Sequence, residues 1–304
     1  MQVLNFIENE REQKTTACLY HYTSVDAFLG MLKDFSTENK NLKMWATNVL
    51  FLNDPSEYEY GKYICQFLLQ EIEEELKVEE SKQLANLMQS NFFAMWELAS
   101  SHIPTDLNDS IPYVISFSKE ADSLPMWNSY GKNGNGIAIG FNKSKLVKLK
   151  RSFGQDSPND FTLRNCLYDL NLKEFVAIKE KIKIQYEKMQ EMTEKCNSHE
   201  IFAQQVEIIR LLKCQVAPFI KHIGYKYERE VRCKVYKAKQ ILCRAAKGMA
   251  VPYVEVEIPI DCIEKIIIGP TLDAERMYFA VNTLLNSKNI NNIRIEVSTI
   301  PYRG

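Results

Sequence analysis

The sequence lacks long apolar runs. No stretch approaches the roughly 20 apolar residues that a membrane-spanning helix requires. Its opening residues, MQVLNFIENEREQKTT, carry acidic side chains early and contain no long apolar segment of the kind that a secretory signal needs. We therefore expect no membrane association and a cytoplasmic location.

The chain also lacks an excess of charge of either sign. It has 38 basic and 39 acidic residues, and its formal net charge is −1. Because non-specific binding to nucleic acid depends on a positive field, no global attraction to nucleic acid is expected. The segment NKSKLVKLKR, 142–151, forms a local basic helix that could touch phosphates, although a solvated helix face explains the pattern as well.

Paired cysteines and phosphate-binding loops are missing too. None of the eight cysteines forms a C-x-x-C pair, so we expect reduced, structural thiols and no metal site. The segment GKNGNGIAIGF is rich in glycine, but no G-K-[ST] closes it. Its glycines precede a strand, whereas those of a dinucleotide fingerprint follow one. A Walker-type nucleotide site is therefore excluded.

Glycine is absent from residues 155–223, and helical patterns occupy most of that region. Segments with strand composition, such as YVISFSK, GIAIGF, YVEVEIP and IEKIIIGP, occur elsewhere without a regular β-α-β alternation. This mixture predicts an α+β fold with a mixed, largely antiparallel sheet and flanking helices. We expect one domain spanning 1–304, with helical insertions at about 56–100 and 172–222.

The segment YKYEREVRCKV, 225–235, alternates strictly and predicts a strand. Its mostly apolar face suggests core. The other face would carry Glu228 and Glu230 about 7 Å apart, flanked by cations that include Arg232. One interpretation is a solvated strand face with salt bridges. The other is an E-x-E pair in which one carboxylate meets a ligand while the arginine holds its partner.

A second candidate segment is ISFSKEADSLPMWNSYG. Ser116 and Ser118 would share one strand face, and Trp127 and Tyr130 would share one face of a short helix. The glycines that follow would let backbone approach a ligand closely. A tight hairpin below a core tryptophan explains the same residues.

Histidine is scarce, with four residues in the chain, and one of them lies in LYHYTSVDAF at the end of a predicted strand. His21 is followed by Tyr22 and Thr23, just before a helix-capping signal. Either it is a core histidine or it belongs to a nucleotide pocket.

These segments, taken in order, resemble the bacterial domain of unknown function 2971 family. They are LYHYTS, LNDPSEYEYG, SFSKEADSLPMWNSYGKNGNGIAIGF, YKYEREVR, IIIGP and VSTIPY, and they run from about residue 19 to 302. The glycine-free helical region would be an enlarged insert. The family's name implies no activity.

A more distant resemblance does imply one. YHYTS is similar to the first motif of ADP-ribosyltransferases of the diphtheria-toxin and polymerase type, in which a strand ends in His-Gly-Thr/Ser. Tyr22 stands here in place of the glycine and crowds the position of the adenosine ribose. The second motif places an aromatic beside a serine-bearing strand, and the third places a glutamate, often in an E-x-E pair, on a later strand. These enzymes use a split mixed sheet, which matches the predicted fold class.

The resemblance implies NAD as the substrate and no metal. It gives Glu230 the catalytic role, with Glu228 as its alternative and His21 orienting NAD. Tyr130 or Trp127 would stack on nicotinamide. The implied NAD-binding set is His21, Tyr22, Thr23, Ser116, Ser118, Trp127, Tyr130 and Arg232.

The chemistry suits those residue types. Nicotinamide leaves the ribose through an oxocarbenium-like transition state, which a preorganised carboxylate stabilises. The leading hypothesis is therefore an NAD-using ADP-ribosyltransferase-like enzyme or an NAD hydrolase. As the resemblance implies, such an enzyme would be a toxin or an anti-phage defence effector, with an unknown protein or nucleic-acid acceptor and an antitoxin or defence-system partner. Two alternatives stay open: a non-catalytic sensor that binds a nucleotide or a partner, and an NAD-independent nucleic-acid-processing enzyme.

Overall fold

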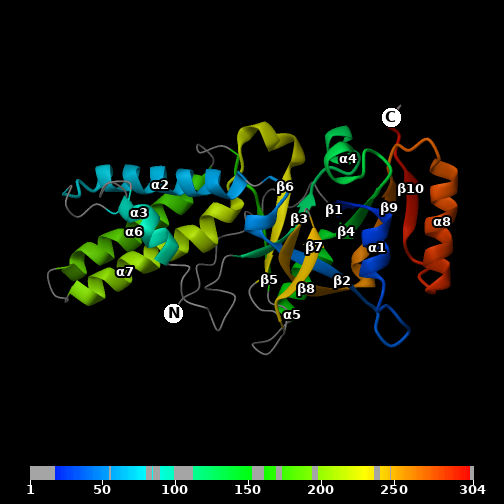
Figure 1. The fold of residues 1–304 in the computed structure, drawn as a ribbon, viewed down its shortest axis with the longest axis horizontal. Coiled ribbons are helices and arrows are strands. Elements are labelled where there is room, and N and C mark those ends of the chain that lie inside the picture. Colours follow the sequence, from blue (N-terminus) through cyan, green and yellow to red (C-terminus); the bar gives the residue numbers. More distant parts are fainter. Residues whose placement is uncertain are drawn as a thin grey trace.

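We describe a computed structural model of the chain. It describes residues 18–54, 56–79, 84, 90–98, 112–152, 161–168, 173–193, 198–235, 240–246 and 248–301. Within these residues one sheet of ten strands forms the centre of the molecule, and helices lie on both sides of it (Figure 1). The α+β class expected from the sequence is confirmed.

The strands are β1 (Cys18–Thr23), β2 (Asn41–Asn48), β3 (Tyr113–Ser118), β4 (Ile137–Asn142), β5 (Phe161–Asn165), β6 (Glu230–Val235), β7 (Leu242–Ala246), β8 (Met249–Pro259), β9 (Ile263–Ile268) and β10 (Arg294–Val297). Their order is β10-β9-β4-β1-β3-β2-β8-β7, and β6 and β5 branch from β3. Among these strands the pair β9–β10 is parallel and the other pairs are antiparallel. The prediction of a mixed, largely antiparallel sheet is confirmed.

The sheet splits at β3. Strand β6 pairs with β3 along its whole length, from Tyr113 to Ser118, and so occupies one edge. The opposite edge is shared: β1 meets it at Tyr20↔Ser118, whereas β2 meets it at Thr47↔Val114 and at Asn48↔Tyr113. Strands β1 and β2 therefore diverge from the two ends of β3.

The two faces of the sheet bury different clusters. Alternate side chains of a strand point to opposite faces. Leu19 and Phe117 face a core that also takes side chains from α1 (Val25–Met31), α5 (Lys143–Ser152) and α8 (Ala274–Ser287). Tyr20 and Tyr22 face the opposite side, where they pack against α4 (Leu124–Tyr130). The chain thus builds one large core and a smaller cluster under α4.

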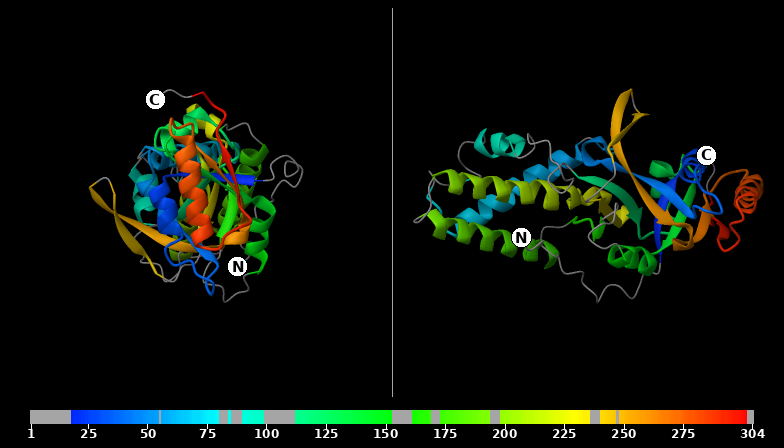
Figure 2. Two further views of the ribbon diagram at one scale, coloured as in Figure 1. Left: turned by 90° about the vertical axis from the view of Figure 1, so that its right-hand side faces the viewer. Right: turned by 90° about the horizontal axis from the view of Figure 1, so that it is seen from below.

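A helical arm extends from the sheet and has its own apolar core. It is made of α2 (Glu57–Glu75), α3 (Ser90–Leu98), α6 (Lys173–Thr193) and α7 (Ser198–Leu211). Figures 1 and 2 show it projecting to one side, and Figure 2 shows the hairpin β7–β8 standing out separately. On α2, Cys65, Leu68, Leu69 and Ile72 recur at helical spacing and are fully buried. Each leucine or isoleucine so buried stabilises the arm by roughly 1.5–3 kcal/mol.

The arm occupies much of the two ranges in which helical insertions were expected, 56–100 and 172–222. The rest of the first range lies partly outside the described residues. In the second range the helix α7 ends early, and a π-helical turn, η4 (Leu212–Val216), and a 3-10 turn, η5 (Ala217–Phe219), follow it. None of the described helices is long and apolar enough to cross a membrane.

The predicted strand 225–235 is wrong in its first part. Residues Ile223–Glu228 form a 3-10 helix, η6, in which the N–H of Gly224 donates to the His222 ring, and the strand begins only at Glu230. Between them Arg229 adopts a left-handed conformation, with φ of 42°. An extended strand cannot pass through that conformation, so the alternation of 225–228 does not reflect strand pairing.

Candidate functional site

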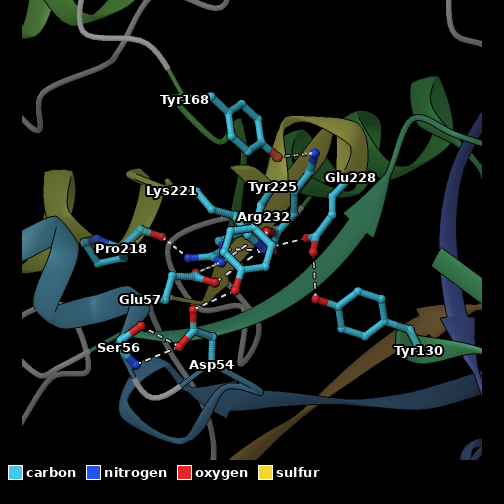
Figure 3. A network of polar contacts seen from close by, with 11 residues as sticks. Asp54, Ser56, Glu57, Tyr130, Tyr168, Pro218, Lys221, Tyr225, Glu228 and Arg232 are labelled. Carbon is cyan, nitrogen blue, oxygen red and sulfur yellow. Dashed lines mark hydrogen bonds and ion pairs between the residues drawn. The ribbon is translucent and has the colours of Figure 1, made fainter. Parts of the chain in front are cut away.

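Five charged side chains meet where the arm joins the sheet. All five are almost fully buried, at 7% exposed or less. We call them the charge cluster: Glu57, Lys221, Glu228, Glu230 and Arg232. Figure 3 labels each of them except Glu230. They come from the first turn of α2, from the segment between η5 and η6, from the end of η6 and from β6. Charged residues are rarely buried unless they are paired, so the packing of this region depends on these contacts.

Arg232 joins three parts of the chain. Its Nε donates to Glu230 Oε1 at 2.8 Å and its Nη2 to Glu230 Oε2 at 3.1 Å. Nη2 also donates to Glu57 Oε1, and Nη1 donates to the carbonyl oxygen of Pro218 at 2.5 Å. The planar guanidinium is suited to several simultaneous contacts of this kind. Arg232 thus connects β6 to α2 and to η5.

Lys221 faces all three carboxylates. Its Nζ lies 2.5 Å from Glu228 Oε2, 2.8 Å from Glu230 Oε2 and 3.3 Å from Glu57 Oε2. Two cations and three carboxylates leave the cluster with one uncompensated negative charge when every group is ionised. A buried negative charge of this kind attracts a developing positive charge on a ligand.

The two glutamates of the E-x-E pair differ in their electrostatics. Burial alone would raise the pKa of Glu230, but the charges of Arg232 and Lys221 outweigh burial and hold that pKa well below its usual range. Burial raises the pKa of Glu228, and Lys221 only partly offsets it. Glu230 is therefore a firmly ionised partner of the cations, whereas Glu228 lies closer to a protonation change.

Half-buried tyrosines surround the charge cluster (Figure 3). The Tyr130 hydroxyl donates to Glu228 Oε1 at 3.1 Å, and the Tyr168 hydroxyl accepts from the backbone N–H of Glu230 at 2.9 Å. The Tyr225 ring lies 5.1 Å from Lys221 Nζ, and its hydroxyl donates to Asp54 Oδ2 at 3.1 Å. Burial raises the pKa of Tyr130, so its hydroxyl stays a donor at neutral pH.

The structure brings together four of the residues singled out in the sequence. Glu228, Glu230 and Arg232 belong to the charge cluster, and Tyr130 contacts it. The two carboxylates meet through Lys221, although Glu228 lies outside the strand that presents Glu230. The face that holds Glu230 and Arg232 is not solvated, so the interpretation as an exposed strand face is wrong.

The two serines and Trp127 have structural contacts. Ser118 Oγ donates to the carbonyl oxygen of Glu228 at 2.6 Å and accepts from the N–H of Glu120 at 2.9 Å, which fixes the end of η6. The carbonyl oxygen of Ser116 is bonded to His21. Trp127 is fully buried, and its Nε1 donates to an aspartate at 2.6 Å. A ring so enclosed has no free face for nicotinamide.

His21 lies on the other face of the sheet. Tyr22 packs edge-on against Trp127, with ring centroids 4.7 Å apart, whereas the His21 ring lies 6.0 Å from Phe117. His21 Nδ1 is 2.9 Å from the carbonyl oxygen of Ser116, and burial lowers the histidine's pKa. Because Ser118 pairs with both Tyr20 and Glu230, the side chain of Glu230 points to the face of Tyr20 and Tyr22. The strand register therefore separates His21 from the charge cluster.

The neighbours of His21 have roles in the fold. The Tyr22 hydroxyl donates to the carbonyl oxygen of Glu120 at 2.9 Å. Thr23 is buried, and its carbonyl oxygen would lie 2.5 Å from a Cβ atom on Gly136. This close approach of two backbones accounts for one glycine of the glycine-rich segment.

Sequence reasoning missed Glu57, Lys221, Tyr168 and Tyr225. Glu57 lies in LNDPSEYEYG, a segment that entered the sequence analysis only through the resemblance to the family. Lys221 follows the apolar residues APFI, and no local pattern marks it as buried, because lysine is almost never buried unless it is paired. In the described part of the chain no group of three or more histidine, cysteine, aspartate or glutamate side chains could hold a metal ion.

Residues 126–233 match the model of a family described as protein of unknown function (DUF2971), which confirms the resemblance to that family. The match includes Tyr130 and four members of the charge cluster, whereas Glu57 and the LYHYTS segment lie outside it. Neither a curated protein nor a solved structure matches the chain.

Proposed function

We propose that the chain is an NAD-using enzyme that cleaves the bond between nicotinamide and ribose and passes ADP-ribose to an acceptor or to water. The carrying observation is Glu228. It is a buried carboxylate in a cluster with one uncompensated negative charge, and its Oε1 meets the half-buried Tyr130 hydroxyl at 3.1 Å. The split of the sheet at β3 agrees with the fold that the distant resemblance implies.

Glu228 suits the reaction better than Glu230. Both oxygens of Glu230 are bound by Arg232, and Lys221 is a further partner. Glu228 has one oxygen on Lys221 and the other on Tyr130. In this proposal a ribose hydroxyl of the substrate would bond to Glu228 Oε1 in place of the Tyr130 hydroxyl, and the tyrosine ring would stack on the substrate.

The reaction needs no oxidant or metal. The bond from C1′ to the nicotinamide nitrogen breaks, and its electron pair leaves with nicotinamide. The ribose gains positive charge, which the negative cluster stabilises. The acceptor or water then bonds to C1′ and loses a proton.

The test is nicotinamide release from NAD by the purified chain and by folded variants. Glu228→Gln should lower kcat by roughly 100-fold or more because it removes the charge that stabilises the transition state. Tyr130→Phe keeps the ring and should retain activity, whereas Tyr130→Ala should raise KM. The matched control is Glu120→Gln, which breaks the exposed pair with Arg229 beside the site and should change neither constant.

One observation favours a second candidate, a non-catalytic module that binds a nucleotide or a partner. Every carboxylate of the charge cluster already has a cationic partner, as in a purely structural network. NAD binding without nicotinamide release, with and without candidate acceptors, would support this function. Absence of both binding and release would contradict the NAD proposal.

A further inference from the structure

Glu57 is the helical arm's contribution to the charge cluster. It is the first residue of α2 and is 7% exposed. One carboxylate oxygen accepts from Arg232 Nη2, and the other lies 3.3 Å from Lys221 Nζ. Glu57 therefore contacts Lys221, which binds Glu228 and Glu230, and Arg232, which binds Glu230.

The arm is fixed to the sheet beside this point by cations that donate to backbone carbonyls. Arg232 Nη1 donates to Pro218, Lys234 Nζ to Cys214 at 2.9 Å and Arg164 Nη1 to Gln215 at 2.7 Å. The three carbonyls belong to η4 and η5, where the chain leaves the regular helix α7. Carbonyls at the end of a helix run out of intrahelical donors, and side chains of β5 and β6 donate to these three. A shift of the arm would therefore change the contacts of the Arg232 guanidinium.

Glu57 also competes with Glu228 for Lys221. With Glu57 charged, Lys221 is shared among three carboxylates. If Glu57 were neutral, the two cations would face only Glu228 and Glu230, and the cluster would have no net charge. Lys221 would then pair more fully with Glu228. The charge of Glu228 would be more completely neutralised, and its attraction for a positively charged substrate would be weaker.

We propose that Glu57 is a positioning residue, through which the seating of the helical arm on the sheet sets the charge and orientation of Glu228. This inference rests on the proposed function, because it assigns Glu228 to the reaction. It makes the arm a control element: a ligand or partner that shifts α2 changes the activity of the site without touching Glu228.

The first test follows the titration of the Glu228 carboxyl group by NMR, with its signal assigned by Glu228→Gln. The groups that face Glu228 are Lys221, Glu230 on β6 and Tyr130 on α4. Removing the charge of Glu57 releases Lys221 toward Glu228, so Glu57→Gln should lower the titration midpoint by roughly 0.5–1 unit. An unchanged or raised midpoint would overturn the inference.

Glu75→Gln is the matched control. Glu75 ends the same helix and pairs with Lys179 at 2.8 Å and Lys183 at 3.0 Å, within the arm. Its removal should leave the midpoint unchanged, and an equal shift in both variants would show a general charge effect and overturn the inference. If Glu57→Gln does not fold, Glu57→Asp replaces it. The shorter side chain cannot reach both cations, so a smaller downward shift is expected, and no shift counts against the inference.

The second test is kinetic. Glu57→Gln should lower kcat for nicotinamide release roughly tenfold with little change in KM, because it alters the site and not the binding of substrate. A midpoint shift in a chain that releases no nicotinamide would contradict the proposed function and support the link between arm and site. Release with an unchanged kcat in Glu57→Gln would overturn the inference and leave the proposed function standing.

Discussion

Replacing Arg232 with methionine removes the guanidinium that joins the sheet to the arm. The side chain is 2% exposed, and it donates to both oxygens of Glu230, to Glu57 and to the carbonyl oxygen of Pro218. Methionine fills most of the volume, so the main loss is electrostatic. Three buried carboxylates would then share the single cation Lys221.

The expected cost follows from this geometry. Removing one partner of a buried ion pair destabilises a protein by about 3–5 kcal/mol, because the other partner stays buried and uncompensated. Total stabilities of single domains are about 5–15 kcal/mol, so this loss is a large fraction of the whole. We therefore expect Arg232→Met to lower the free energy of unfolding by about 3–5 kcal/mol.

Urea unfolding followed by circular dichroism measures this cost. Arg210→Met is the control, since Arg210 pairs with Glu207 at 2.8 Å on the arm surface, where such pairs contribute about 1 kcal/mol or less. The double variant Arg232→Met, Glu230→Gln should regain part of the loss by removing an uncompensated charge. A loss below about 1 kcal/mol for Arg232→Met would refute the view that this cluster holds the arm on the sheet.

Two further predictions concern stability. Because the cations depress the pKa of Glu230 below its ordinary value of 4.5, its ionised form favours the folded state; that stabilisation is present above about pH 4.5 and is lost as the pH falls through the folded pKa. Urea unfolding between pH 7 and pH 3 should therefore show that the free energy of unfolding falls less with decreasing pH in Glu230→Gln than in the wild type. An equal fall in both proteins would argue against a stabilising role of ionised Glu230. Gly136→Ala would place a Cβ atom 2.5 Å from the carbonyl oxygen of Thr23 and 2.8 Å from that of Gly131, so we expect a loss of about 1–3 kcal/mol. Thermal unfolding of Gly136→Ala beside Gly30→Ala checks this, because at Gly30 nothing beyond the adjoining residues and the backbone of its own helix lies within 4 Å of the added Cβ. Equal melting temperatures would contradict the prediction.

The local patterns of the sequence determined several parts of the molecule. Strand composition predicted β3, β4, β8 and β9, because β-branched and aromatic residues favour strands. Helical patterns predicted much of the arm, because burial of one helix face follows from a period of 3.6 residues. The pairing of Glu230 with Arg232 was also within reach, since both lie on one face of β6. Tyr130 was chosen for its position on a short helix, and that helix is present.

Only the tertiary structure decided how these parts meet. The sequence pattern continued β6 back to residue 225, but the left-handed Arg229 ends it and turns Glu228 toward Lys221. His21 was chosen for its motif, yet strand register places its side chain on the face opposite Glu230. Glu57 is separated from Lys221 and from β6 by a long stretch of chain, whereas Lys221 lies close to β6 in the sequence. Their contacts arise because the arm folds back onto the sheet, and no local period records such a long-range pairing of buried charges.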